Sequence, residues 1–201
     1  RRLEGGEWVV DLRNRKAYAA SHLAGIVSLG LDGPMATWLG WMIDRGAPVT
    51  LVGETRDQVA AAQRELARIG IDALAGAAIG QPAELATDPG RLRGTRLAGF
   101  VDLAASLRDR TGEPPGADVV LDVRTHNEFR TSHVRGAVHI PLYELKDRLG
   151  EIPDGVVWVH CGSGYRATAA ASLLERAGRS AVVVDDHFDN AGGAGVPVTD
   201  D

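Results

Sequence analysis

Short apolar runs alternate along this chain with longer amphipathic stretches. Residues 49–53 and 157–161 are nearly continuous apolar runs, and each precedes a stretch rich in Ala, Leu, Arg and Glu, at 56–69 and 166–177. Such runs are typical of strands buried on both faces of a parallel sheet. The Ala- and Leu-rich stretches predict helices, and a glycine after each one supplies the positive φ that a helix C-terminus favours. The pattern therefore predicts an α/β fold.

The same pattern occurs twice. Val9–Arg13 and Val120–Arg124 are both apolar runs that end in Asp-apolar-Arg, and Ser21–Gly25 and Ser132–Gly136 follow them at equal distances. The two copies are 111 residues apart in these segments, and 108 residues apart in the later strand and helix pairs. The second copy is therefore three residues shorter in between. A repeat of this kind predicts two α/β units in one chain.

A stretch rich in Pro and Gly separates the copies and gives the predicted domain limits. We expect a first domain at 1–82, a linker at 83–94 and a second domain at 95–201. Only ten residues precede Asp11, whereas the second copy has an additional segment, including a predicted helix at 102–108. We therefore expect a first domain truncated at its N-terminus, in a chain that is the C-terminal part of a longer protein. The alternative is a first domain that is simply shorter.

Composition and charge exclude several classes of function. The 201 residues have 44% hydrophobic content and a net charge of −5, so a packed core is possible and nucleic acid is not an expected partner. The single cysteine forms no intramolecular disulfide, and the six histidines lack metal-ligand spacing, so we expect neither a metal nor another cofactor. With only short apolar stretches and no leader-like start, we expect a cytoplasmic protein without membrane contact.

The cysteine lies in the segment with the clearest chemical signal. Cys161 opens the loop Cys-Gly-Ser-Gly-Tyr-Arg, between a predicted strand and the N-terminus of a predicted helix. Backbone N–H groups and the helix dipole favour an anion there, Gly162 and Gly164 allow a positive φ, and Arg166 adds a positive charge. A lone cysteine is more often a small buried apolar residue. In this loop, however, we expect a site that can hold a thiolate, a persulfide, or the anionic donor that attacks or leaves the sulfur.

This loop resembles the active loop of the rhodanese sulfurtransferase family. The resemblance extends to Asp122–Arg124, Glu128–Phe129, His133, Gly136–Ala137 and Ile140–Pro141, and through the repeat to about nine-tenths of the chain. It departs from the family pattern at Ser132, where a glycine is usual, and at Val134–Arg135, where Ile-Pro is usual.

The resemblance implies tandem rhodanese domains, each a small parallel sheet flanked by helices on both faces. It implies that Cys161 accepts sulfane sulfur from thiosulfate or a persulfide and passes it to a thiol or similar acceptor. The expected substrate-binding residues are Gly162, Ser163, Gly164, Tyr165, Arg166 and Arg124. The paired glycines, together with Leu31–Trp41 of the first copy, also resemble rhodanese units fused behind metallo-β-lactamase-fold hydrolases or persulfide dioxygenases. Such an upstream domain is therefore an expected partner.

Two alternatives remain open. One is a non-catalytic binding or regulatory module in which the loop only docks a partner. The other is an arsenate reductase or phosphatase, which the loop length disfavours: similar cysteine phosphatases have five residues between Cys and Arg, and here four separate Cys161 from Arg166.

The first copy lacks the nucleophile. Gly53 stands in the place of Cys161 and Gln58 in the place of Arg166, so its role is expected to be structural or regulatory. Arg124 and Glu128 are four residues apart, and we expect an ion pair at a helix start, with donor binding by Arg124 as the alternative.

The remaining aromatic and histidine positions favour packing roles. His133 has a counterpart in the first copy, which favours a role in a turn, and strand alternation points the His160 side chain away from that of Cys161. Trp38 and Trp41 are expected in the core or at a contact between the units.

Overall fold

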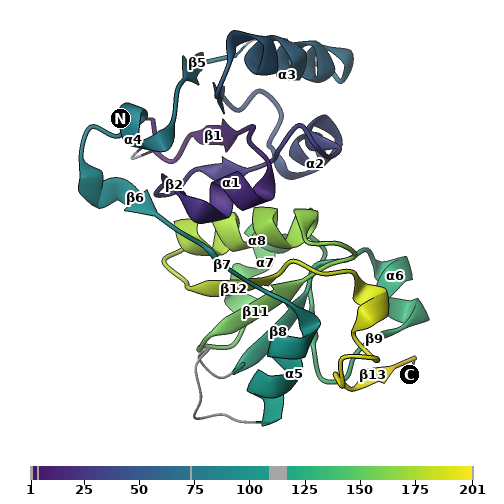
Figure 1. Cartoon of the computed structure of the whole chain (residues 1–201). Coiled ribbons are helices and arrows are strands. Elements are labelled where there is room, and N and C mark those ends of the chain that lie inside the picture. The colour runs from purple at the N-terminus through teal and green to yellow at the C-terminus, as the bar shows by residue number, and fades with distance from the viewer. Residues whose placement is uncertain (1, 4, 73, 109–116, 201) are drawn as a thin grey trace. The chain divides into compact units, whose positions relative to one another are not determined.

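The computed structural model describes residues 2–3, 5–72, 74–108 and 117–200. The chain divides into two compact units, Arg1–Gly94 and Thr95–Asp201. Figure 1 shows the elements of each unit.

The first unit is built on a four-stranded sheet. Its elements are β1 (Trp8–Asp11), α1 (Arg15–Ala20), β2 (His22–Leu23), β3 (Val27–Ser28), α2 (Met35–Met42), β4 (Val49–Gly53), α3 (Arg56–Arg68), β5 (Gly76–Ile79), α4 (Pro82–Leu85), η1 (Pro89–Arg91) and β6 (Leu92–Arg93). The strand order is β3-β1-β4-β5 and every pairing is parallel. Tyr18 of α1 packs with Val9 and Val52 on one face of the sheet. Helices α2 and α3 lie on the other face (Figure 1).

The segment expected to be a linker contains regular structure. Residues 83–94 include most of α4, all of η1 and β6, and β6 pairs antiparallel with β2. This segment is grouped with the first unit.

The second unit is built on a five-stranded sheet. Its elements are β7 (Arg96–Ala98), α5 (Phe100–Arg108), β8 (Val119–Asp122), α6 (His126–Thr131), β9 (His133–Val134), β10 (Val138–His139), α7 (Leu145–Arg148), η2 (Leu149–Glu151), β11 (Val157–His160), α8 (Tyr165–Arg176), β12 (Ala181–Val184), η3 (Phe188–Asn190) and β13 (Val198–Thr199). The order is β10-β8-β11-β12-β7, again parallel throughout. The strands end together at one edge, so Asp122 and His160 are directly paired neighbours there.

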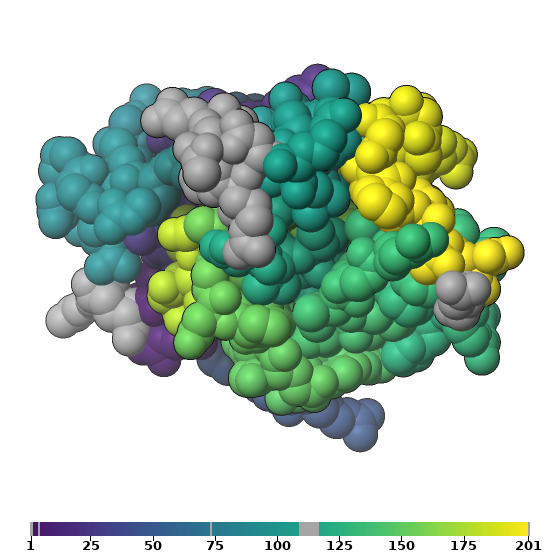
Figure 2. All heavy atoms as spheres, turned by 90° about the horizontal axis from the view of Figure 1, so that it is seen from below, coloured from purple at the N-terminus to yellow at the C-terminus, as the bar shows by residue number. Residues whose placement is uncertain are grey.

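Helices cover both faces of this sheet. Phe100 and Leu103 of α5 pack on one face, against Trp158 and Val182. Helices α7 and α8 lie on the opposite face (Figure 1). The C-terminal segment joins the α5 side, where β13 pairs antiparallel with β9, and it is visible in yellow beside the green α6 and β9 region in Figure 2. The α/β class and the parallel sheets flanked by helices are as predicted.

The predicted helix ends are confirmed. The helices α3 and α8 end within one residue of the predicted limits, and the glycines that follow, Gly70 and Gly178, have φ of 81° and 75°. Among the described residues, no helix has both the length and the apolar character to span a membrane.

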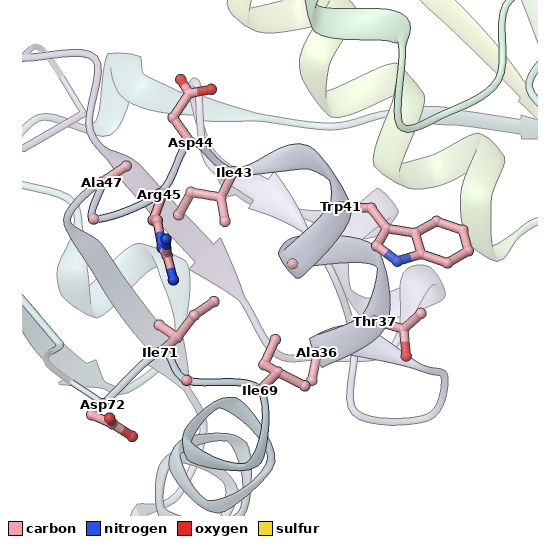
Figure 3. A pocket seen from close by; sticks show the side chains of 13 residues that line it. Ala36, Thr37, Trp41, Ile43, Asp44, Arg45, Ala47, Ile69, Ile71 and Asp72 are labelled. Atoms are coloured by element: carbon pink, nitrogen blue, oxygen red, sulfur yellow. The ribbon is translucent and has the colours of Figure 1, made fainter.

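A pocket of about 650 Å³ lies in the first unit, away from the loop that carries the cysteine in sequence (Figure 3). It is lined by residues of α2, by the loop that follows α2, and by residues 69–72 after α3.

Candidate active site

Cys161 lies at the junction of β11 and α8. Its side chain is buried, with 1% exposure, and the Gly164 amide donates a hydrogen bond to Sγ at 3.2 Å. Gly164 is the N-cap of α8 and has φ of 94°, a backbone conformation that a side chain would strain. Ser163 and Tyr165 are half-buried beside it. The sulfur therefore lies at the positive end of a twelve-residue helix, bonded to the amide of its N-cap.

The structural role of the glycine at position 162 differs from the one that the sequence predicted. Its φ is not positive, so the prediction of a positive φ there is wrong. A Cβ at this position would lie 2.9 Å from Nη2 of Arg166 and 3.7 Å from Oε1 of Glu128. A side chain at this position would therefore have to displace the end of the Arg166 side chain, which packs directly against the loop backbone.

Arg166 is paired with Glu128. Its Nη1 and Nη2 each donate to one carboxylate oxygen at 2.7 Å. Glu128 also accepts from the amide and the hydroxyl of Thr125, which caps α6. The Arg166 hydrogen bonds, followed by those from Thr125, lower the pKa of Glu128 to about 2 against the opposing effect of burial. The carboxylate is therefore ionised at neutral pH.

This pairing corrects one sequence expectation. Arg124 does not form an ion pair with Glu128. Thr125 is the N-cap of α6, so Arg124 lies before the helix and cannot take part in an i,i+4 pair on it.

Arg124 instead forms a buried ion pair with Asp122. The Asp122 carboxylate accepts from Nε and Nη2 of Arg124, at 2.6 Å for the shortest contact, and from the Arg124 amide at 2.9 Å. Nη2 of Arg124 also donates to the Ser132 carbonyl at 2.7 Å, and its guanidinium lies 3.6 Å from the centroid of the Phe188 ring. The side chains of Asp122 and Arg124 are 0% and 4% exposed. The guanidinium expected to bind a donor is thus buried and bonded within the fold.

His160 and His133 both have packing contacts. His160 is fully buried, stacks on Phe188 and meets Phe100 edge to face. Burial lowers its pKa to about 4, so the imidazole is neutral at neutral pH. Nδ1 of His133 lies 3.0 Å from the Phe129 carbonyl, and the two rings stack.

Phe188 is a residue that sequence analysis missed. Its amide donates to the Gly162 carbonyl at 3.1 Å, so it links the active loop to the buried Arg124 and His160. It comes from η3, which follows β12 in the chain, and no local motif marks it.

The first unit repeats part of this arrangement. Arg13 binds Asp11 and the Ser21 carbonyl as Arg124 binds Asp122 and the Ser132 carbonyl. His22 stacks on Tyr18 and bonds to its carbonyl in the same way as His133 and Phe129.

The loop after β4 differs from the cysteine loop. Gln58 accepts from the Glu54 amide at 2.7 Å, and Thr55 caps α3. This loop contains no thiol. Trp38 is buried and Trp41 is 57% exposed, with their rings edge to face.

Comparisons with known proteins agree with the geometry. Residues 103–191 match the family model of the rhodanese-like domain. Among curated proteins, the chain is 36% identical over 76 residues to the thiosulfate sulfurtransferase PspE of Escherichia coli, covering 36% of this chain and 67% of that protein. It is 35% identical over 116 residues to the HTH-type transcriptional regulator Rv0324 of Mycobacterium tuberculosis, covering 49% of this chain and 51% of that protein. The chain therefore spans about half the length of the latter relative.

A solved structure is similar to one half of the chain. A rhodanese-related protein from Thermoplasma volcanium is 26% identical, with a TM-score of 0.45, and the match covers 53% of this chain and 99% of that one. With a rhodanese-like domain at residues 103–191, the chain belongs to the rhodanese family.

Proposed function

We propose that the second unit is a sulfurtransferase that carries sulfane sulfur as a persulfide on Cys161. The observation that carries the proposal is the position of the thiol. Its sulfur accepts a hydrogen bond from the Gly164 amide at the N-terminus of α8, and the Arg166 guanidinium packs against the same loop. An N–H group and a helix dipole at the sulfur favour an anion there.

The chemistry needs no cofactor. The Cys161 thiolate attacks the outer sulfur of the donor, forming a new S–S bond as the bond in the donor breaks. Sulfite leaves when the donor is thiosulfate, and a thiolate leaves when it is an organic persulfide. An acceptor thiolate then attacks the outer sulfur of the Cys161 persulfide, takes that sulfur and releases the Cys161 thiolate. No net oxidant or reductant is required. Ser163 and Tyr165, which are half-buried on the loop, contact the donor.

We propose further that the first unit is a second, inactive rhodanese domain. Its support is the repeated set of contacts around Asp11 and Arg13, and the glycine in the place of the nucleophile. An upstream metallo-β-lactamase-fold domain belongs to the same proposal, and it rests on the resemblance of the loop and of Leu31–Trp41. We also propose a cytoplasmic location, which rests on the shortness of the apolar runs in the sequence.

A non-catalytic binding module is the second candidate. One observation favours it: Cys161 is only 1% exposed, so a donor must enter the loop before the sulfur can react. A curated relative named as a transcriptional regulator is compatible with such a role.

The mass of the intact protein distinguishes the two candidates. After treatment with thiosulfate or an organic persulfide, the wild type should gain one sulfur atom, and cyanide or excess thiol should remove it. The Cys161→Ser variant is the matched control, because it removes the sole thiol and keeps the size of the side chain. A gain that persists in the variant, or a wild type that never gains sulfur, would contradict the transferase.

A further inference from the structure

The ion pair between Glu128 and Arg166 lies against the backbone of the cysteine loop. Both Nη atoms of Arg166 are bonded to Glu128 at 2.7 Å, and a Cβ at Gly162 would lie within 4 Å of both side chains. The Arg166 side chain is 15% exposed and that of Glu128 is 37% exposed. A donor that reaches Cys161 therefore meets a carboxylate and a guanidinium together, not a guanidinium alone.

The repeat gives an internal comparison for this pair. The contacts that the first unit keeps are the Asp-Arg ion pair and the stacked aromatic and histidine. At the equivalent positions it has Gly53 for Cys161, Gln58 for Arg166 and Ala17 for Glu128. The carboxylate is thus absent from the unit that lacks the thiol and the guanidinium, although that unit keeps the Asp-Arg ion pair and the stacked aromatic and histidine. Glu128 is therefore present where the thiol and the guanidinium are present, and absent where they are absent.

The position of Glu128 is fixed by its own helix. Thr125 and Glu128 form a reciprocal capping box at the start of α6, which holds the carboxylate toward Arg166. The Arg166 hydrogen bonds lower the pKa of Glu128 to about 2, so it keeps its charge throughout the neutral range. The local charge of the pair is zero. A dianionic donor gains little from such a pair and is repelled by the half-exposed carboxylate.

We propose that Glu128 sets the donor preference of Cys161, by neutralising Arg166 and thereby favouring organic persulfides of low charge over the thiosulfate dianion. This inference rests on the proposed sulfurtransferase function and names its substrate class. With an organic persulfide, the Cys161 thiolate takes the outer sulfur and the leaving thiolate carries one charge. With thiosulfate, the entering donor and the leaving sulfite each carry two negative charges, and both lie beside the same carboxylate.

The test is a charge series at the pair. The readout is the ratio of rates of sulfur addition to Cys161 from thiosulfate and from the persulfide of mercaptoethanol, measured by intact mass. Glu128→Gln removes the negative charge, and Gln is accepted at this position of a capping box. Its ratio should rise about ten- to a hundredfold, as expected when a charge-assisted bond to the donor is gained. Arg166→Gln exposes the carboxylate alone, and its ratio should fall.

The double variant Glu128→Gln with Arg166→Gln tests whether the net charge of the pair, and not Arg166 alone, sets the donor ratio. It is locally neutral like the wild type, so both rates change together and the ratio stays within about threefold of wild type. If Arg166 alone bound the donor, the double variant would match Arg166→Gln, and Glu128→Gln would match wild type. Glu151→Gln is the matched control, because Glu151 is bonded to Arg148 by two similar contacts outside the loop. Its ratio should not change.

The outcomes separate the two proposals. A wild type that gains no sulfur from either donor overturns the proposed function, and this inference with it. A wild type that gains sulfur, while the ratio in Glu128→Gln is unchanged or lower, overturns only the role of Glu128. If Glu128→Gln does not fold, the double variant takes its place, because it leaves no unpaired charge. A donor ratio near that of the wild type then supports the role of Glu128. A donor ratio as low as that of Arg166→Gln overturns it.

Discussion

Replacing Asp122 by Ala should destabilise the second unit by about 3 kcal/mol, because it leaves the Arg124 guanidinium buried without a counter-ion. The Arg124 side chain is 4% exposed, and it loses its contacts to both carboxylate oxygens of Asp122. Breaking a buried pair from one side costs about 3–5 kcal/mol. The contacts to the Ser132 carbonyl and the Phe188 ring remain and compensate in part, so we expect the lower end of that range.

Hydrogen exchange measured by mass spectrometry is the suitable assay, because it reports the unfolding free energy of peptides from each unit separately. Peptides that cover β8 and β11 should lose protection in Asp122→Ala. The first unit supplies a matched control, since Asp11 binds Arg13 with the same geometry and similar burial. Asp11→Ala should cause a similar loss in peptides that cover β1 and β4 instead.

A second variant separates charge burial from lost packing. Adding Arg124→Met to Asp122→Ala removes the unpaired charge, so the double variant should be more stable than Asp122→Ala alone. A loss below about 1 kcal/mol in Asp122→Ala would mean that the pair behaves like an exposed ion pair. A double variant that is less stable than Asp122→Ala would refute the argument that the unpaired guanidinium causes the loss.

Three further predictions concern the loop and its surroundings. Gly164→Ala should lower the unfolding free energy by about 1–2 kcal/mol, because its φ of 94° is unfavourable for a residue with a side chain, and denaturation curves check this. Gly162→Ala should leave the stability closer to that of the wild type but should alter the donor preference by displacing Arg166, which the ratio of sulfur-addition rates checks. The depressed pKa of His160 predicts that stability is lost as pH falls from about 6.5 through about 4, since the unfolded chain takes up the proton first; the unfolding free energy of His160→Leu should depend less on pH over this range. In a Cys161→Ser background, Gly53→Cys alone should form no persulfide, and replacing residues 53–58 by the full active hexapeptide should restore measurable formation, as seen by intact mass.

The sequence predicted the secondary structure well where local rules decide it. The apolar runs became the strands β4 and β11, and the helices after them end at glycines with positive φ. These features depend on neighbours within a few residues, and apolar periodicity records them directly. The place of the loop between strand and helix was likewise predictable, because a strand, a glycine pair and a helix start are contiguous, but the backbone conformation of Gly162 was not.

The partners of the charged residues were not predictable in the same way. Glu128 and Arg166 are 38 residues apart, and only the folded sheet brings α6 next to the start of α8. Spacing suggested Arg124 as the partner of Glu128, but the cap at Thr125 places Arg124 outside the helix. Local charge spacing is informative only when both residues lie on one element. Nothing in the sequence near Phe188 marked its contact with Arg124, because that contact depends on how the segment after β12 returns over the sheet.

The change of offset in the repeat has a structural counterpart in the pocket of the first unit. The two copies differ by three residues between the equivalent histidines, His22 and His133, and the end of the next central strand. In this interval the first unit has the eight-residue helix α2 and a following loop, and the second has the four-residue α7 and η2. The lining of the first unit's pocket includes residues of α2 and of that loop, Trp41 and Arg45 among them (Figure 3). The pocket is thus formed in large part by the segment that does not repeat.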